Sequence, residues 1–302
     1  MSLKSDINKY TPRKEQQDCL DFISKTKTDK PDTKFFLLNM PVGVGKSHLA
    51  MMISDWYTSK IDKGSKVDII TAGKILQDQY DDSYESINNL KGKENYDCSQ
   101  YACSCANGKE FNRLNKTSCE FCPYDDAKGS FISGKISLTN FYLYLIYALY
   151  NNGVMDQRKA NVLIVDEAHD FDDVMSDFIS IKITETTIKK LKFTNEDEII
   201  KKLKKVTTIT QYITFLEYLQ GEIISTIDDI DKSMQGGRSA KQDKRDLRIS
   251  KITGAGGNSD VKLMQVISDL KQYQLKIDLF LKEYKANPHN WVLETYLNEK
   301  IN

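Results

Sequence analysis

The sequence predicts an α/β fold, with a parallel sheet covered by helices and a mostly helical part after it. Over the first 170 residues, short apolar runs alternate with helical patterns. This alternation is typical of a doubly wound parallel sheet. Beyond residue 170 the apolar residues recur at helical spacing, as at Ile213, Leu216 and Leu219. The second half is therefore expected to be helical.

The alternation of elements expected in the first part is interrupted once, between residues 80 and 135. The elements are a helix over residues 11–24, a strand over 34–39, a helix over 46–57, a strand over 66–71, a helix over 72–80, a strand over 135–139, a helix over 141–150 and a strand over 161–165. Residues 86–128 show no strong period and are expected to form a long loop. The run at 161–165 is apolar throughout, which predicts a position in the middle of the sheet. In the second part, helices are expected over residues 184–191, 195–206, 208–234 and 260–284, with a polar connection over 235–258.

The composition is that of a globular protein without a strong overall field. The chain has 302 residues, of which 40% are hydrophobic and 28% charged, and its formal net charge is zero. Any contact with nucleic acid must therefore come from a local patch. No apolar run is long enough to cross a membrane, and the amino-terminal residues do not resemble a signal peptide. We expect a protein of the cytoplasm, or of the nucleus in a eukaryote, with no membrane contact.

The first expected strand leads into Met-Pro-Val-Gly-Val-Gly-Lys-Ser at residues 40–47. A glycine-containing loop between a strand and a helix points backbone N–H groups and the positive helix end at a polyphosphate. Lys46 would reach the β- and γ-phosphates of ATP, and the Ser47 hydroxyl would ligate Mg²⁺. Met40 stands where the usual motif has its first glycine. The residues expected to contact the nucleotide here are Gly43, Val44, Gly45, Lys46, Ser47 and His48.

A second polar group follows the last expected strand, with the sequence Asp-Glu-Ala-His at residues 166–169. An acidic pair at a strand end, downstream of a phosphate loop, is the expected partner of that loop. Asp166 would hold Mg²⁺ through water, and Glu167 would orient the attacking water. These two carboxylates and Lys46 are the predicted catalytic residues. His169 completes a DEAH sequence, which suggests a role in coupling the nucleotide to nucleic acid.

Five of the six cysteines lie within one short segment. In a long intracellular chain, such a cluster indicates a metal site. Four thiolates suit either Zn²⁺ or a [4Fe–4S] cluster, and the spacing alone leaves both open. The five are Cys98, Cys103, Cys105, Cys119 and Cys122.

Together these motifs resemble the first part of superfamily 2 DNA helicases of the XPD/DinG-like iron–sulfur group, from about residue 10 to 171. The segment Tyr-Thr-Pro-Arg-Lys-Glu-Gln at 10–16 resembles the one ahead of the first strand, which implies that Arg13 and Gln16 lie near the nucleotide. Thr71, Leu76 and Gln79 match the spacing of a DNA-backbone motif. The sequence Leu-Thr-Asn-Phe at 138–141 resembles a further strand end of the family.

The resemblance implies a RecA-like motor domain over residues 1–170, with the cysteine-rich insertion at 85–130, and an arch-like helical domain over 171–302. It favours a [4Fe–4S] cluster on Cys98, Cys105, Cys119 and Cys122, with Cys103 as the alternative to Cys105. It also implies Mg²⁺-dependent ATP hydrolysis, 5′→3′ movement on single-stranded or forked DNA, and a second motor domain that these 302 residues lack.

Two alternatives remain open at this point. One is a half-helicase that binds single-stranded DNA or docks a partner without turnover. The other is a zinc-stabilised phosphate-loop ATPase that acts on something other than DNA.

Overall fold

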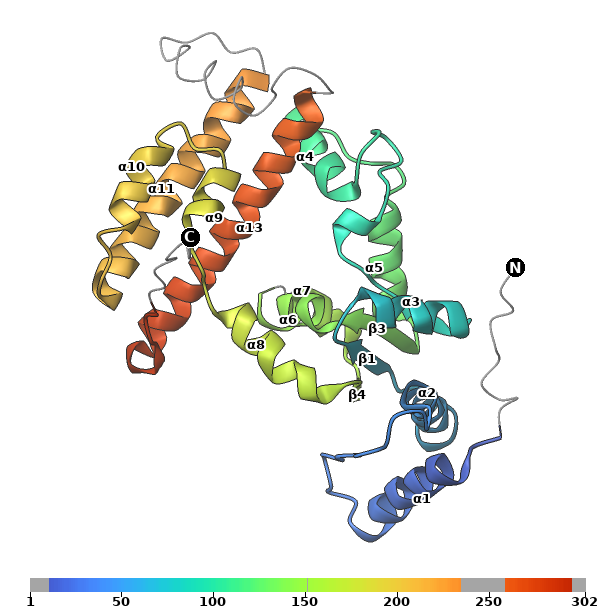
Figure 1. The fold of residues 1–302 in the computed structure, drawn as a ribbon. Helices are drawn as coiled ribbons and strands as arrows, with labels where there is room; N and C mark the ends of the chain where they lie inside the picture. The colour runs from blue at the N-terminus through green and yellow to red at the C-terminus, as the bar shows by residue number, and fades with distance from the viewer. Residues whose placement is uncertain (1–10, 151, 235–258, 295–302) are drawn as a thin grey trace. The chain divides into compact units, whose positions relative to one another are not determined.

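The computed structural model describes residues 11–150, 152–234 and 259–294, and the chain forms two compact units (Figure 1). The first unit extends to Asn95 and resumes over Pro123–Met175. The second consists of Tyr96–Cys122 and the part of the chain after Met175. The cysteine-rich segment is thus grouped with the helical half. The polar connection predicted over 235–258 lies outside the described residues.

The first unit contains a parallel four-stranded sheet. Its strands are β1 (Val67–Thr71), β2 (Ile87–Asn89), β3 (Ile136–Asn140) and β4 (Val162–Val165), in the order β2-β3-β1-β4. Every residue of β1 is buried, as expected for a strand between two parallel neighbours. The predicted α/β fold of RecA-like type is confirmed.

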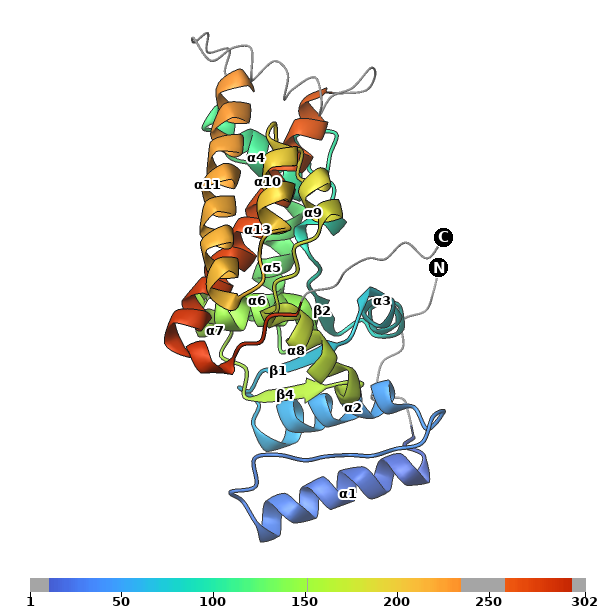
Figure 2. The same cartoon turned by 60° about the vertical axis from the view of Figure 1, so that its left-hand side comes forward.

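Most helices of the first unit flank this sheet, and the first helix lies farther from it than the others (Figure 2). The helices of this unit are α1 (Lys14–Asp29), α2 (Lys46–Trp56), α3 (Lys74–Ser83), α5 (Pro123–Ser133), α6 (Phe141–Leu149) and α7 (Asn152–Arg158). A π-helical turn, Tyr57–Ile61, follows α2, and 3₁₀ turns lie at Lys93–Asn95 and Ala168–Asp170. Helices α3, α5 and α6 contact the strands directly. The side chains of Met51 and Met52 bring α2 into the same core as Ile69 and Leu138.

A fully buried ion pair fixes α7 to the central strand. Arg158 Nε donates to Asp68 Oδ1 at 2.7 Å, and both side chains are 0% exposed. The same guanidinium donates to the Val67 carbonyl oxygen at 2.9 Å. Removing one partner of such a pair leaves an uncompensated buried charge, which typically costs about 3–5 kcal/mol. The pair explains how a charged residue can occupy the middle of β1.

Two sequence predictions about the sheet are wrong. The segment 34–39 forms no strand, and two of its apolar side chains are left in solvent, with Phe35 91% and Leu37 88% exposed, while Phe36 and Leu38 are half-buried. The strand β4 lies at the edge of the described sheet instead of its middle, and Leu163 is 44% exposed. Both differences have the same reason. β4 pairs with β1 on one side, and no described strand, the segment 34–39 included, pairs with its other side.

The second unit is a helical assembly, as predicted. Its helices are α4 (Cys105–Asn115), α9 (Glu185–Lys190), α10 (Glu196–Leu203), α11 (Ile209–Met234) and α13 (Ser259–Ala286), with a 3₁₀ turn at Pro288–Asn290. Helix α8 (Phe171–Ile179) crosses the division between the units. The long helices α11 and α13 pack together through completely buried residues such as Leu216, Leu219, Ile267 and Leu270, and α4 packs on α13.

The region 86–128, predicted to be a loop without regular structure, contains β2, α4 and the start of α5. The buried face of α4 explains why its period is not visible in the sequence. Besides Cys105 and Leu114, that face consists of Asn107, Gly108 and Asn112, which an apolar-periodicity argument does not count. The segment therefore derives its order from polar packing as well as from the cysteines.

Among the described residues, no helix combines the length and the apolar character needed to cross a membrane.

Candidate functional site

The loop before α2 has the backbone conformation of a phosphate-binding loop. Gly43 and Gly45 have φ values of 86° and 84°, which are in the left-handed region that side chains rarely adopt. Helix α2 begins at Lys46, directly after Gly45. The N–H groups of this first turn have no carbonyl partner within the helix. They therefore point into the loop, where an anion can accept hydrogen bonds from them.

Two residues from the start of α1 hold the loop from outside. Arg13 Nη1 donates to the Gly43 carbonyl oxygen at 2.8 Å, and Gln16 Nε2 donates to the Val44 carbonyl oxygen at 3.0 Å. The Arg13 backbone N–H in turn donates to Gln16 Oε1 at 2.9 Å, which fixes the amide. A Cβ added to Gly45 would stand 2.9 Å from Gln16 Nε2, so this position needs glycine for space as well as for φ. Arg13 and Gln16 thus contact the loop itself.

The end of β4 brings two carboxylates to the phosphate loop. Asp166 Oδ2 accepts from the Ser47 hydroxyl at 3.1 Å, and Glu167 Oε1 lies 2.9 Å from Lys46 Nζ. These contacts join residues 119 and 121 positions apart in the chain. The structure therefore brings together the four side chains that the sequence assigned to catalysis and Mg²⁺.

Backbone strain occurs at one of these carboxylates. Glu167 has φ 55° and ψ 49°, a left-handed conformation that a non-glycine residue adopts at a cost of about 1 kcal/mol or more. This turn ends β4 and starts the 3₁₀ turn at Ala168–Asp170. It directs the side chain of Glu167 toward Lys46. No sequence signal identified the strain.

Two tyrosines reach the same site, Tyr80 of α3 and Tyr84, which directly follows the end of that helix. The Tyr80 hydroxyl donates to Asp166 Oδ2 at 2.8 Å and is buried. Burial, reinforced by the Asp166 charge, raises the pKa of Tyr80 well above its usual value, so the hydroxyl keeps its proton. One helical turn on, the Tyr84 hydroxyl lies 2.8 Å from Nδ1 of His48, and the two rings stack. Neither tyrosine was predicted as a site residue.

His48 and His169 differ in their surroundings. Burial, followed by the nearby Arg13 charge, lowers the pKa of His48, so its ring is neutral at physiological pH. His169 is 73% exposed, and its ring nitrogens lie 3.4 Å from Glu167 Oε2 and 3.3 Å from Asp170 Oδ1. It stands at the rim of the site and is open to a partner.

The residues expected to contact DNA lie at the end of β1 and on α3. Thr71 is buried and donates from its hydroxyl to the Gly73 carbonyl oxygen at 3.3 Å, whereas Gln79 is exposed. Leu76 is half-buried. The neighbouring Gln77, which the sequence analysis did not select, is completely buried and links α3 to the ends of β2 and β3 through Asn89 and Asn140.

The five clustered cysteines are reduced, and three of them are near one another. Burial raises the pKa of Cys119, the Asn112 side chain opposes this by donating to Cys119 Sγ at 2.8 Å, and Cys98 and Cys122 raise it further. Cys105 is directed elsewhere, because its Sγ lies 3.5 Å from the Asp97 carbonyl oxygen. Within the described ranges, no three or more His, Cys, Asp or Glu side chains are arranged to hold a metal ion.

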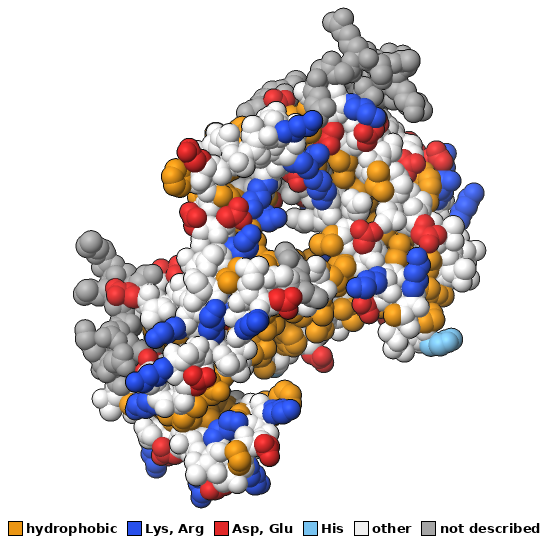
Figure 3. Space-filling view, turned by 180° about the vertical axis from the view of Figure 1, so that it is seen from behind, with side chains coloured by type: hydrophobic (Ala, Val, Ile, Leu, Met, Phe, Trp, Pro, Cys, Tyr) orange, Lys and Arg blue, Asp and Glu red, His pale blue; other side chains and the backbone are white. Residues whose placement is uncertain are grey.

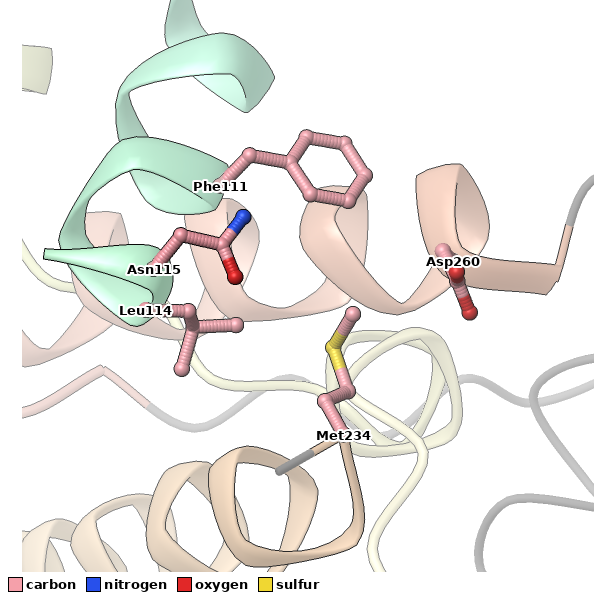
Figure 4. A pocket seen from close by; sticks show the side chains of 5 residues that line it. All are labelled: Phe111, Leu114, Asn115, Met234 and Asp260. Atoms are coloured by element: carbon pink, nitrogen blue, oxygen red, sulfur yellow. The ribbon is translucent and has the colours of Figure 1, made fainter. Parts of the chain in front are cut away.

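A small pocket of about 190 Å³ lies in the second unit, where α4 meets the ends of α11 and α13 (Figure 4). It is lined by Phe111, Leu114, Asn115, Met234 and Asp260. It contains none of the predicted site residues. Its lining is mixed and carries one carboxylate, so we regard it as a gap between helix ends.

Charges of both signs are interspersed on the face shown in Figure 3. Several lysines of the second unit are paired, such as Lys204 with Glu185 at 2.9 Å and Lys202 with Glu198 at 3.4 Å. This agrees with the formal net charge of zero. Attraction of a polyanion must therefore be local.

The parallel sheet, the phosphate loop and the facing carboxylates define a helicase-like P-loop domain of superfamily 2. The chain belongs to the family described as type III restriction enzyme, res subunit, whose model matches residues 9–210. This match covers α1, the whole sheet and the first helices of the second unit. No curated protein matches the chain.

Proposed function

We propose that this chain is the amino-terminal part of an ATP-dependent DNA helicase of the XPD/DinG-like iron–sulfur group. The observation that carries the proposal is the pairing of Lys46 and Ser47 with Glu167 and Asp166, from two segments more than 100 residues apart. Membership of a helicase-like family supports ATPase chemistry in general. The subgroup rests on the motif order and on the position of the cysteines.

The geometry is suited to phosphoryl transfer from ATP to water. Lys46, at the start of α2, would neutralise charge on the β- and γ-phosphates, and Ser47 with Asp166 would hold Mg²⁺. Glu167 would orient the attacking water once Lys46 turns to the phosphates. Gly43, Val44, Gly45 and His48 would complete the cradle, which Arg13 and Gln16 hold in place.

We place the nucleic-acid contact at the carboxyl end of β1 and the start of α3. Lys74, Ile75 and Gln79 are exposed there, and so is Asp78, whose carboxylate is paired with Lys91. Ligands of open α/β sheets bind outside the carboxyl ends of the strands. The assignment to DNA, and to 5′→3′ movement, comes from the resemblance to the helicase group.

We further propose a structural metal centre on the cysteine segment. The proposal rests on the position of the cysteines in the chain, because the described side chains are not arranged to hold a metal ion. Cys98, Cys119 and Cys122 are the expected ligands, and the Asn112 donor to Cys119 Sγ is of the kind that supports a thiolate ligand. The fourth ligand would be Cys105 or Cys103. Cys103 is kept as the alternative because Cys105 faces the Asp97 carbonyl oxygen. A [4Fe–4S] cluster, or Zn²⁺ as the alternative, would fix the fold of this segment.

In the same proposal, residues 1–170 act as the first motor domain with its cysteine insertion, and 171–302 form the arch-like part. A stabilising arginine from a second motor domain normally raises hydrolysis by about 10³–10⁵. We therefore expect the 302-residue chain to bind nucleotide weakly, hydrolyse it slowly and not unwind DNA alone.

ATPase measurements with and without single-stranded DNA test the proposal. Slow hydrolysis that DNA stimulates, and that Lys46→Ala abolishes, is the expected result. DNA binding with no turnover in either protein would favour the half-helicase that only binds. Hydrolysis indifferent to DNA would remove the helicase assignment.

Anaerobic purification followed by iron, sulfide and zinc analysis tests the metal separately. Four irons and four sulfides per chain, with broad visible absorbance, are expected for the cluster. A colourless protein with one zinc would instead favour a zinc-stabilised ATPase.

A further inference from the structure

We propose that Tyr80 is a positioning residue that holds the carboxylate of Asp166 for Mg²⁺ and thereby links helix α3 to the nucleotide site. The inference rests on the proposed function, because it assigns Asp166 to the metal. It adds to that function a residue that lies outside both nucleotide motifs.

The contact of Tyr80 with Asp166 is specific and shielded. The hydroxyl lies 2.8 Å from Asp166 Oδ2, the tyrosine is 1% exposed and the aspartate is 7% exposed. An ionised carboxylate only accepts hydrogen bonds, so the tyrosine must be the donor. Donation to a charged acceptor in such an environment is stronger and shorter than a neutral hydrogen bond.

Asp166 Oδ2 has a second hydroxyl donor beside Tyr80. Ser47 also donates to it, at 3.1 Å. A serine hydroxyl can ligate Mg²⁺ through an oxygen lone pair and still donate its proton. Tyr80 and Ser47 would therefore fix the orientation of the carboxylate together, and Tyr80 is the donor that comes from outside the phosphate loop.

The position of Tyr80 connects this carboxylate to the rest of α3. The helix begins at Lys74, three residues after β1 ends, at the edge where we place the nucleic acid. Tyr84, which directly follows the helix, contacts His48 of the phosphate-loop helix α2. A shift of α3 on contact with nucleic acid would therefore move the donor to Asp166.

The test measures how much Mg²⁺ strengthens the binding of a fluorescent ADP analogue. In the unmodified chain Mg²⁺ should tighten binding, and Asp166→Asn should abolish this gain. Tyr80→Phe, which keeps the ring, should reduce the gain by about tenfold, in line with loss of a hydrogen bond to a charged group. Its metal-free affinity should stay unchanged, whereas its melting temperature should fall modestly because a buried hydrogen bond is lost. Tyr212→Phe in α11, which loses a hydroxyl that donates to the Ile181 carbonyl oxygen at 3.0 Å, is the matched control and should retain the full gain.

A Tyr80→Phe protein with the same Mg²⁺ gain as the unmodified chain would overturn the inference, and so would an equal loss of metal-free and Mg²⁺-dependent binding. If the unmodified chain itself binds ADP without any response to Mg²⁺, that result would contradict the proposed function and with it the assignment of Asp166 to Mg²⁺. A second measurement avoids reliance on the folding of Tyr80→Phe. The fluorine resonance of 3-fluorotyrosine at position 80 should shift when Mg²⁺ joins bound ADP, and the same label at position 212 should not. An unshifted signal at position 80 would also contradict the inference.

Discussion

Lys46 Nζ lies 2.9 Å from Oε1 and 3.1 Å from Oε2 of Glu167, so one ammonium bridges both oxygens of the carboxylate. Each partner is assigned a different task in hydrolysis, one on the phosphates and one on the water. An incoming phosphate must therefore compete with Glu167 for the ammonium group of Lys46. The same exchange would free Glu167 to hold water.

Lys46→Ala should weaken nucleotide binding by about 10–100-fold, because it removes a charged hydrogen-bond donor to the phosphates. The pair is partly exposed, with side chains 32% and 26% accessible, so its loss should cost at most about 1 kcal/mol of stability. Fluorescent-nucleotide titration and a melting curve measure the two effects. Lys60→Ala, at an exposed position just beyond α2, is the control and should change neither. A large drop in melting temperature for Lys46→Ala would show that the site had unfolded instead.

Glu167→Gln should separate binding from hydrolysis. The amide cannot take a proton from water, so turnover should fall by about 10²–10⁴. Since the amide also releases Lys46 from its ion pair, nucleotide affinity should rise or stay equal. Parallel ATPase and binding assays measure the split. Equal losses in both would mean that Glu167 supports the loop and does not act on water.

Gln16→Ala should loosen the phosphate loop from outside the motif. Gln16 is 3% exposed and donates to the Val44 and Gly45 carbonyl oxygens at 3.0 and 3.2 Å. Loss of a donor to partly buried carbonyls costs about 1–3 kcal/mol, so nucleotide affinity should fall by about tenfold or more. The neighbouring Gln17, which is exposed and donates to Asp21 Oδ1 along α1, gives the matched control Gln17→Ala. Identical affinities for the two variants would refute a role for Gln16.

The contacts among the nucleotide motifs could be anticipated because each motif is contiguous and because parallel strands end at one edge of a sheet. The segment 34–39 shows the limit of that reasoning. Its run Phe-Phe-Leu-Leu has the composition of a buried strand, but a strand also needs a paired neighbour. Pairing is non-local, and composition did not reveal that β4 has no described strand on that side.

The missed residues share a different reason. Tyr80 and Arg158 act on Asp166 and Asp68, which are 86 and 90 positions away in the chain. No local sequence pattern identifies the partners of these two residues. One weak signal for Tyr80 itself was present on and just after α3, where Gln77, Tyr80 and Tyr84 recur at helical spacing and so share a face. That face is polar and was therefore not counted as a core.

Gly108→Ala should disrupt the cysteine segment. A Cβ at this position would stand 2.4 Å from Cys98 Sγ and 3.0 Å from Cys98 Cβ, so Cys98 would have to move. We expect a loss of about 1–3 kcal/mol from overpacking and a marked fall in bound iron or zinc. Gly221→Ala in α11, where an added Cβ meets nothing within 4 Å, is the control and should gain up to about 1 kcal/mol. Normal metal content in Gly108→Ala would argue against Cys98 as a ligand.

Acid should weaken the attachment of α4 within the second unit through Glu110. Burial raises the pKa of this carboxyl, but hydrogen bonds and charges from Lys271 and Arg113 outweigh it, and the net pKa is lowered. A lowered pKa in the folded state stabilises the protein above the ordinary value of 4.5, and this contribution is lost as the pH falls through the lowered pKa. Melting temperatures from pH 7 down to about pH 3 should therefore decline more steeply in the unmodified chain than in Glu110→Gln, whose amide does not titrate. Glu217→Gln, at an exposed position on α11, should leave the slope unchanged. Parallel slopes for the unmodified chain and Glu110→Gln would mean that other carboxyls govern the acid transition.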